Sequence, residues 1–250
     1  NLRLKRILSK SRAWVTISNS YLNWVKEKAT LPNSKDSNVF PLGYPTNELN
    51  SPNFSESRIN EIMSKFQMDR ENFIVLFIGQ LEKSYDIETV ISAAENFLKN
   101  KKIKFIIGGD GAKRHKVVEA SEKLNNLIYT GWLNENEILS LLKISKIGLI
   151  PYKKYAFQSL PYKPFEYMCG GLALLSSLEG DLAKIIDKNK IGLNYTAGNK
   201  DSLIQKIEYF FNNEKITKEM GVRSRQLFLE KYRSELVYSE FSNYISKMIS

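Results

Sequence analysis

Short, continuously apolar runs alternate along the chain with longer amphipathic stretches. Runs rich in β-branched and aromatic residues lie at 14–18, 39–43, 73–79, 104–108, 127–131, 147–151, 172–176 and 192–195. Most are apolar at every position and do not alternate, a pattern typical of strands buried on both faces of a parallel sheet. The spacing therefore predicts a sheet whose two faces are both covered.

Amphipathic segments of helical length separate these runs, at 86–98, 113–124, 135–143, 161–168 and 182–188. Alternating strands and helices predict an α/β fold with a doubly wound parallel sheet. In such a fold the helices lie on both faces, and ligands bind at the carboxyl ends of the strands. We therefore expect functional residues just after the apolar runs.

Two regions lie outside this alternation. Residues 1–37 contain a basic helix, the run at 14–18, a helix to about Ala29 and most of a polar segment, 32–38, and we expect the end of a preceding domain plus a linker. Residues 38–230 are predicted to form the main domain, and the chain is helical from about 201 to its end. Because the chain begins at Asn1 without an initiator Met, we expect it to be part of a longer protein.

Composition narrows the chemistry only partly. With 37 basic and 27 acidic residues the net charge is +10, which is compatible with a phosphate-bearing substrate, a nucleic acid or an anionic membrane as partner. The alternative, which the scattered lysines favour, is a solvated basic surface, so charge alone does not decide the function. A single cysteine, Cys169, excludes an internal disulfide framework and fits a reducing cytoplasm. One histidine, His115, gives no recognised metal-binding pattern, and we expect it to face solvent.

The densest chemical signal is the segment 158–176, QSLPYKPFEYMCGGLALLS. Ser159 or Leu160 is expected to cap a helix with Pro161 in its first turn, and the two glycines at 170 and 171 are expected to end it. The free amides of the first turn form an anion site.

One face of this predicted helix combines an acid with a base. Tyr162, Lys163 and Glu166 are three and four residues apart and can share that face. The Glu166 carboxylate can accept hydrogen bonds from two ribose hydroxyls while the helix start faces a phosphate. The alternative is a capped surface helix with a Glu–Lys pair.

This segment resembles the family 4 glycosyltransferases, which carry two glutamates separated by seven residues before a small residue, a glycine and an apolar strand. The stretch 163–173 matches the second half of that motif. The resemblance implies that Glu166 binds the nucleotide ribose. Gln158 stands at the first acidic position, where an amide can bind a sugar hydroxyl but supplies no charge.

A second block, 77–90, is similar to the family's diphosphate-binding turn. There Gly79 follows a strand, Lys83 matches the family's lysine, and Gln80 replaces its arginine, in a loop about two residues shorter. The resemblance implies that Lys83 and backbone amides grip the diphosphate, helped by Lys163. The alternative is that Lys83 is a solvated surface lysine. Asp86 is expected to cap the next helix.

A third block joins 105–111, which ends in Gly-Asp-Gly, to 129–133. In the family the main chain of this turn holds the base, which implies a base site at Trp132 and Leu133. Trp132 is equally compatible with a packing role. The glycine pattern lacks the last glycine of a dinucleotide fingerprint, so a nicotinamide site is disfavoured.

The resemblance covers roughly residues 13–245 and implies the donor half of a two-domain, GT-B glycosyltransferase. Residues 1–37 would be the remnant of the acceptor domain with its linker, and 231–250 a helix crossing back to that domain. The expected reaction is retaining transfer from a UDP- or GDP-sugar to a saccharide or lipid-linked saccharide, without metal or cofactor, with catalytic roles for Lys83, Gln158 and Glu166.

The expected setting is surface polysaccharide or capsule synthesis, in the cytoplasm or at an anionic membrane face, without nucleic acid. The fragment alone is expected to be inactive. The alternatives are a sugar-nucleotide epimerase, which the single histidine disfavours, and a non-catalytic basic anion-binding module. A nicotinamide dehydrogenase is the third.

Overall fold

Six parallel strands form the main sheet of the computed structural model, which describes residues 2–29, 36–46 and 55–249. Each pairs in parallel with its neighbours, in the order β5-β4-β3-β6-β7-β8. Their bounds are β3 (Phe73–Ile78), β4 (Ile103–Gly108), β5 (Leu127–Gly131), β6 (Ile147–Ile150), β7 (Ala173–Ser176) and β8 (Gly192–Asn194). All six apolar runs from residue 73 onward are therefore strands, with bounds shifted by at most one residue.

Both faces of this sheet are buried, as the apolar runs predict. On β3, the side chains of Ile74, Leu76 and Ile78 enter one hydrophobic cluster, and those of Phe73 and Val75 enter the cluster on the opposite face. The successive side chains of a strand point to opposite faces, so a strand covered on both sides must be apolar throughout. The doubly wound α/β fold is confirmed.

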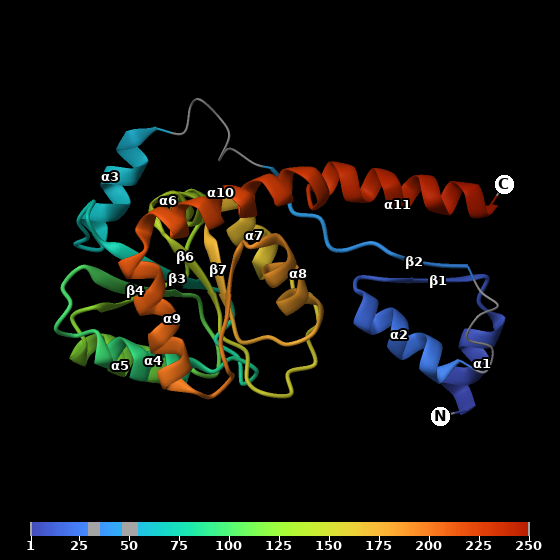
Figure 1. Ribbon diagram of the computed structural model, residues 1–250, viewed down its shortest axis with the longest axis horizontal. Helices are drawn as coiled ribbons and strands as arrows, with labels where there is room; N and C mark the ends of the chain where they lie inside the picture. The colour runs from blue at the N-terminus through green and yellow to red at the C-terminus, as the bar shows by residue number, and fades with distance from the viewer. Residues whose placement is uncertain (1, 30–35, 47–54, 250) are drawn as a thin grey trace.

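Helices cover the two faces (Figure 1). On the first face lie α3 (Glu56–Lys65), α6 (Glu135–Ile144), α7 (Lys163–Gly170), α8 (Asp181–Asn189) and most of α10 (Glu214–Lys231). On the second lie α4 (Ile87–Asn96), α5 (Arg114–Lys123) and α9 (Lys200–Asn212). Within the described ranges, no helix combines the length and apolar character needed to span a membrane.

Helix α3 is absent from the sequence prediction. Its apolar positions Ile59, Ile62 and Met63, with Phe66 just beyond, follow helical spacing and pack on the first face of the sheet. The helical spacing is thus visible in the sequence, but the surrounding Asn, Ser and Arg residues make the apolar pattern weak.

A second, smaller unit precedes the main sheet. It contains α1 (Leu2–Lys10), β1 (Ala13–Thr16), α2 (Asn19–Lys28) and β2 (Asp36–Val39), with β1 and β2 paired in parallel. The strand expected at 39–43 is wrong, because the strand lies at 36–39 and thus includes part of the expected polar linker. Its backbone pairs with the edge of β1, and alternate side chains are exposed, so it does not need a fully apolar sequence. The rest of that linker, 32–35, lies outside the described residues.

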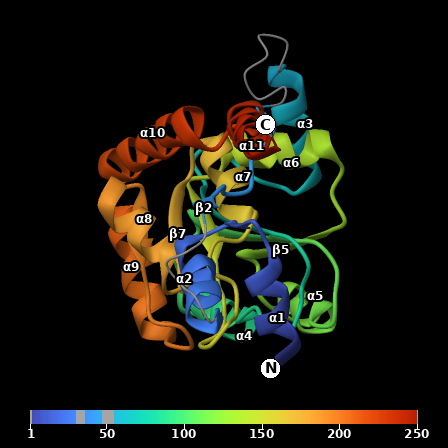
Figure 2. The same cartoon turned by 90° about the vertical axis from the view of Figure 1, so that its right-hand side faces the viewer.

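Two segments cross between the small unit and the main sheet. One is the chain from Phe40 to Thr46, and the other is α11 (Ser234–Ile249), which extends above β2 in Figure 1. The Phe40 ring lies 5.4 Å from the rings of both Phe241 and Tyr244 on α11. Figure 2 shows α1 and α2 in front of the main sheet when the molecule is viewed along the direction of this crossing.

The connection order reverses at the centre of the main sheet. The chain runs from β3 outward through β4 to β5, then returns to β6 on the other side of β3 and continues to β7 and β8. In doubly wound sheets a crevice opens at the carboxyl ends of the strands where this reversal occurs, which here is between β3 and β6.

Candidate functional site

A cavity of about 580 Å³ opens at this reversal point. It is formed by the end of β3 and the loop after it, by Tyr152 just after β6, and by the approach to α7 with its first turn. Its lining residues are Ile78, Gly79, Gln80, Glu82, Ser84, Tyr85, Tyr152, Gln158, Pro161, Tyr162, Lys163 and Glu166.

Six of the residues expected from the sequence line this cavity: Gly79, Gln80, Gln158, Pro161, Lys163 and Glu166. They come from two segments about eighty residues apart, which parallel pairing of β3 and β6 brings together. Tyr162, Lys163 and Glu166 do share one face, as their spacing predicts.

The other five expected residues, Lys83, Trp132, Leu133, Ser159 and Leu160, do not line the cavity. Lys83 is exposed on the loop after β3, and Trp132 is 83% exposed. The side chains of Leu133 and Leu160 are buried in the hydrophobic core, so only their main chains could reach a ligand.

The start of α7 differs from the prediction. The helix begins at Lys163 instead of Pro161, its N-cap residue is Tyr162, and Pro164 occupies its first turn. Ser159 does not cap it, because its hydroxyl donates to Asp181 on α8 at 2.7 Å. The expected end is confirmed, since Gly171 has φ 75°, the left-handed conformation that glycine tolerates.

Asp86 also differs in detail. It precedes α4, but its carboxylate accepts from the Thr89 hydroxyl at 2.7 Å instead of from a backbone amide. His115 is exposed, as expected.

Lys163 is the most unusual group in the cavity. Its side chain is only 9% exposed, and the structure gives its ammonium no hydrogen bond or ion pair with any residue in the described ranges. The nitrogen lies 4.7 Å from the centre of the Phe77 ring and 5.7 Å from that of Tyr85. Burial lowers the Lys163 pKa to about 8, against the opposing attraction of the Glu166 charge.

Gly79 leaves the space that this ammonium occupies. A Cβ on Gly79 would lie 2.1 Å from the Lys163 Nζ atom, and Gly79 has φ 149°, which side chains rarely adopt. The lysine charge therefore lies directly against the backbone at the end of β3, where the sequence predicts a diphosphate.

Glu166 is partly exposed and faces the cavity from the first turn of α7. Its Oε1 accepts a hydrogen bond from the Tyr44 hydroxyl at 3.2 Å. Burial raises the Glu166 pKa, and the Lys163 charge and the Tyr44 hydrogen bond act in the opposite direction. One carboxylate oxygen is thus held by the protein, and the other accepts no hydrogen bond from any residue that the structure describes.

Gln158 adds a neutral acceptor. Its side-chain oxygen is buried without a hydrogen-bond partner in the part of the chain that the structure describes. A buried polar atom of this kind costs stability unless a ligand or water satisfies it.

The sequence analysis did not identify the aromatic wall of the site. Tyr85 and Tyr152 share a hydroxyl–hydroxyl hydrogen bond of 3.0 Å, with ring centres 4.6 Å apart. Tyr44 comes from the crossing segment. Tyr44 does not line the cavity, but its ring lies 5.1 Å from that of Tyr162, which does. Tyrosine is common in this chain, and only the fold places these rings at the site.

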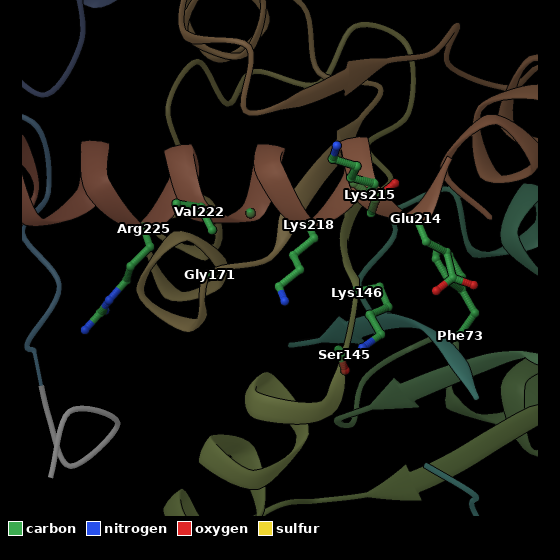
Figure 3. Close-up of a pocket in the computed structure, with 11 residues that line it drawn as sticks. Phe73, Ser145, Lys146, Gly171, Glu214, Lys215, Lys218, Val222 and Arg225 are labelled. Atoms are coloured by element: carbon green, nitrogen blue, oxygen red, sulfur yellow. The ribbon is translucent and has the colours of Figure 1, made fainter. Parts of the chain in front are cut away.

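A second cavity, of about 700 Å³, lies near the amino ends of the central strands, opposite the candidate site (Figure 3). It is lined by Phe73 at the start of β3, by Lys146 just before β6 and by α10 residues such as Lys218. Ligands of doubly wound folds bind at the carboxyl ends of the strands, so we assign the candidate site to the cavity beside Lys163.

Comparison with known proteins identifies the family of this chain. Residues 58–227 match the profile of the family described as glycosyl transferases group 1. The N-acetyl-alpha-D-glucosaminyl L-malate synthase of Bacillus anthracis is 19% identical over 198 residues, which are 76% of this chain and 51% of that protein. The chain spans about half the length of the curated relatives it matches.

Solved structures show the same fold. A glycosyltransferase from Rickettsia africae superposes with a TM-score of 0.82 at 15% identity, covering 100% of this chain and 68% of the other. The Anabaena protein HepE, in complex with UDP-glucose, gives 0.78 at 14% identity, covering 98% and 67%. Because the family profile spans well over half of the chain, the protein belongs to the glycosyl transferases group 1 family, and its main sheet is the Rossmann-like domain of a GT-B fold.

Proposed function

We propose that this chain forms the donor-binding half of an enzyme that transfers a sugar, with retention, from a nucleoside-diphosphate sugar to a hydroxyl acceptor. One observation carries the proposal. A buried ammonium, a carboxylate with one hydrogen bond and a buried amide oxygen face one cavity at the reversal point of the sheet, and among the described residues the ammonium and the amide oxygen have no hydrogen-bond partner.

Each group matches one part of such a donor. The Lys163 ammonium pairs with the diphosphate, and it stabilises the charge that grows on that group as the sugar leaves. The Glu166 carboxylate accepts from the ribose hydroxyls, and the Gln158 oxygen accepts from a hydroxyl of the sugar. Lys83 is proposed to reach the diphosphate from the loop after β3, and the main chain at Trp132 and Leu133 to hold the base.

We propose that the donor is a UDP- or GDP-sugar and that lysine charge takes the place of a metal ion. HepE, which shares the fold, is bound to UDP-glucose in its solved structure, which supports a uridine donor. The likeness to family 4 enzymes supports retention.

The proposed acceptor is a saccharide or lipid-linked saccharide of a surface polysaccharide, at the cytoplasmic face of a membrane. Arg3, Lys5, Arg6 and Lys10 are exposed on α1 and supply charge that an anionic membrane would attract.

A panel of thermal-shift measurements with UDP, GDP, ADP and their sugars tests the donor site. A ligand at 100 times its dissociation constant adds about 2.7 kcal/mol of stability. We expect one nucleotide series to stabilise the protein far more than inorganic diphosphate does. Equal, strongly salt-dependent effects of all polyanions would instead indicate a basic anion-binding module and would overturn the proposal.

We also propose that these 250 residues bind the donor without transferring its sugar, because reaction requires donor and acceptor to be held together. A radiolabelled donor incubated with saccharide acceptors measures transfer. Robust transfer by this chain alone would contradict the expectation.

A further inference from the structure

Tyr44 joins the candidate site to the place where the two crossing segments meet. Its backbone N–H donates to the Tyr232 carbonyl at 2.9 Å, and its carbonyl accepts from the Ser234 N–H at 3.0 Å. Tyr232 is the C-cap residue of α10, and Ser234 begins α11. Tyr44 is therefore fixed, through its backbone, at the junction of α10 and α11.

The neighbouring Gly43 shows how closely the segments approach. A Cβ on Gly43 would lie 2.5 Å from the Ser234 Cα atom, a contact with backbone that cannot move aside cheaply. Any shift of α11 relative to the main sheet must therefore displace residues 43 and 44.

From this fixed backbone the Tyr44 side chain reaches into the main domain. It is 7% exposed, and its ring centre lies 5.1 Å from that of Tyr162 and 6.3 Å from that of Phe228. Its hydroxyl donates to Glu166, and no other hydrogen bond to this carboxylate occurs among the described residues.

We propose that Tyr44 is a positioning residue for ribose recognition, which orients the Glu166 carboxylate and makes that recognition depend on the packing of the two crossing segments. The inference rests on the proposed function of Glu166. The hydroxyl occupies one carboxylate oxygen, which directs the second oxygen into the cavity. It also favours the charged carboxylate, which binds hydroxyl groups more strongly than the neutral acid does.

The charge state of Glu166 provides a readout that packing alone would not change. The ionisable groups around this carboxylate are Lys163, Tyr44, Tyr162, Tyr167 and Cys169. Burial raises the pKa of each of the three tyrosines and of the cysteine, so these groups stay neutral in mildly acidic solution, while Lys163 stays charged. Removing the Tyr44 hydroxyl removes an influence that lowers the Glu166 pKa, so protonation moves to higher pH.

The test compares UDP with 2′-deoxy-UDP by calorimetry across a pH series, for the 250-residue chain and for Tyr44→Phe. The ratio of the two affinities isolates ribose recognition, because both ligands carry the same diphosphate and it titrates equally in each. Tyr232→Phe is the matched control, since Tyr232 is also buried and, among the described residues, the hydroxyl that bonds Glu166 is that of Tyr44. Thermal unfolding of each variant verifies that the fold is kept.

We expect Tyr44→Phe to reduce the preference for UDP about three- to tenfold, the change typical of one lost hydrogen bond. The preference should also disappear at a higher pH than in the parent chain, and Tyr232→Phe should change neither quantity. Gly43→Ala, which displaces the same hydroxyl by forcing the segments apart, should reproduce the loss and add little to Tyr44→Phe.

The possible failures are distinguishable. If the parent chain binds no nucleoside diphosphate, the proposed function fails, and this inference falls with it. If it binds UDP and 2′-deoxy-UDP equally well, the assignment of Glu166 to the ribose fails. If it prefers UDP and Tyr44→Phe keeps both the ratio and its pH dependence, Tyr44 only packs, and the inference is overturned.

Discussion

Replacing Lys163 with methionine should stabilise the protein and weaken diphosphate binding at the same time. Methionine has a similar length and keeps the apolar contacts with Phe77 and Tyr85, but it carries no charge. The change therefore separates the two consequences of a buried ammonium, which are its cost to folding and its benefit to an anionic ligand.

The cost to folding follows from the pKa. A lysine pKa of about 8 instead of 10.5 corresponds to about 3 kcal/mol lost by keeping the charge in the folded state, with the attraction of Glu166 already included. Attraction between the ammonium and the surrounding rings returns about 0.5–2 kcal/mol. We therefore expect Lys163→Met to gain about 1–3 kcal/mol at neutral pH.

The gain should depend on pH in a defined direction. The folded pKa lies below the unfolded one, so between about pH 8 and about pH 10.5 the folded state binds fewer protons, and the stability of the parent chain rises with pH. The advantage of Lys163→Met should thus be largest near neutral pH and shrink above about pH 8.

Binding should change in the opposite sense. Loss of a charged hydrogen-bond donor should weaken UDP binding by about 1.5–3 kcal/mol and leave uridine binding nearly unchanged. In the parent chain, UDP affinity should fall as the pH rises through the Lys163 pKa of about 8, and the variant should lack that fall.

Calorimetry with UDP and uridine, together with chemical denaturation, measures both effects. Lys83→Met is the comparison variant, because Lys83 is an exposed lysine on the neighbouring loop and the residue that the sequence favours for the same role. We expect it to weaken UDP binding less than Lys163→Met does. If Lys163→Met destabilises the protein and keeps full UDP affinity, while Lys83→Met loses it, the reasoning is refuted and Lys83 is the main cation.

Three further changes test other parts of the site and its support. Glu166→Gln should weaken UDP binding by about 1–2 kcal/mol and remove most of the preference for UDP over 2′-deoxy-UDP. A calorimetric double-mutant cycle measures both effects, and strictly additive losses would show that Glu166 does not contact the ribose. Gly79→Ala should displace the Lys163 ammonium and weaken UDP binding more than uridine binding, and an unchanged UDP affinity would contradict this. Burial raises the pKa of Glu88, but hydrogen bonds from Lys113 and Lys116 outweigh it and lower that pKa from 4.5 to about 2. This carboxylate therefore stabilises the fold above its unfolded pKa and loses that effect as pH falls towards 2. Glu88→Gln should therefore flatten the acid dependence of the melting temperature, which a parallel curve would disprove.

The main sheet could be predicted because its signal is local. A strand covered on both faces must be apolar at every position, and the run from Phe73 to Ile78 meets that requirement without any knowledge of its neighbours. The prediction failed for β2, whose alternate side chains are exposed and which pairs with β1 alone among the described strands. There the backbone hydrogen bonds to β1 define the strand, and backbone pairing leaves no apolar pattern to detect.

The candidate site was only half predictable for a related reason. The spacing of Lys163 and Glu166 places them on one face of a helix wherever that helix lies, so their proximity is local information. The burial of Lys163 depends on Gly79 and Phe77, which reach it only through the pairing of β3 with β6. From the sequence alone, Lys83 is therefore the preferred cation for the diphosphate, because it matches the family's lysine after the glycine turn. The sequence does not show whether that lysine faces a ligand or solvent.

The unequal burial of the two lysines gives a physical reason to reverse that ranking. An exposed ammonium is already solvated, and pairing it with a phosphate exchanges one favourable environment for another. Burial removed most of the water around the Lys163 ammonium when the protein folded. In its place the ammonium is near three aromatic rings and is attracted by the Glu166 carboxylate. A diphosphate that enters the cavity meets a cation whose desolvation has already occurred, so more of the Coulomb attraction remains as binding energy. The same reasoning explains why the chain can keep a residue that weakens its fold, since the energy lost in folding is recovered only when an anion binds.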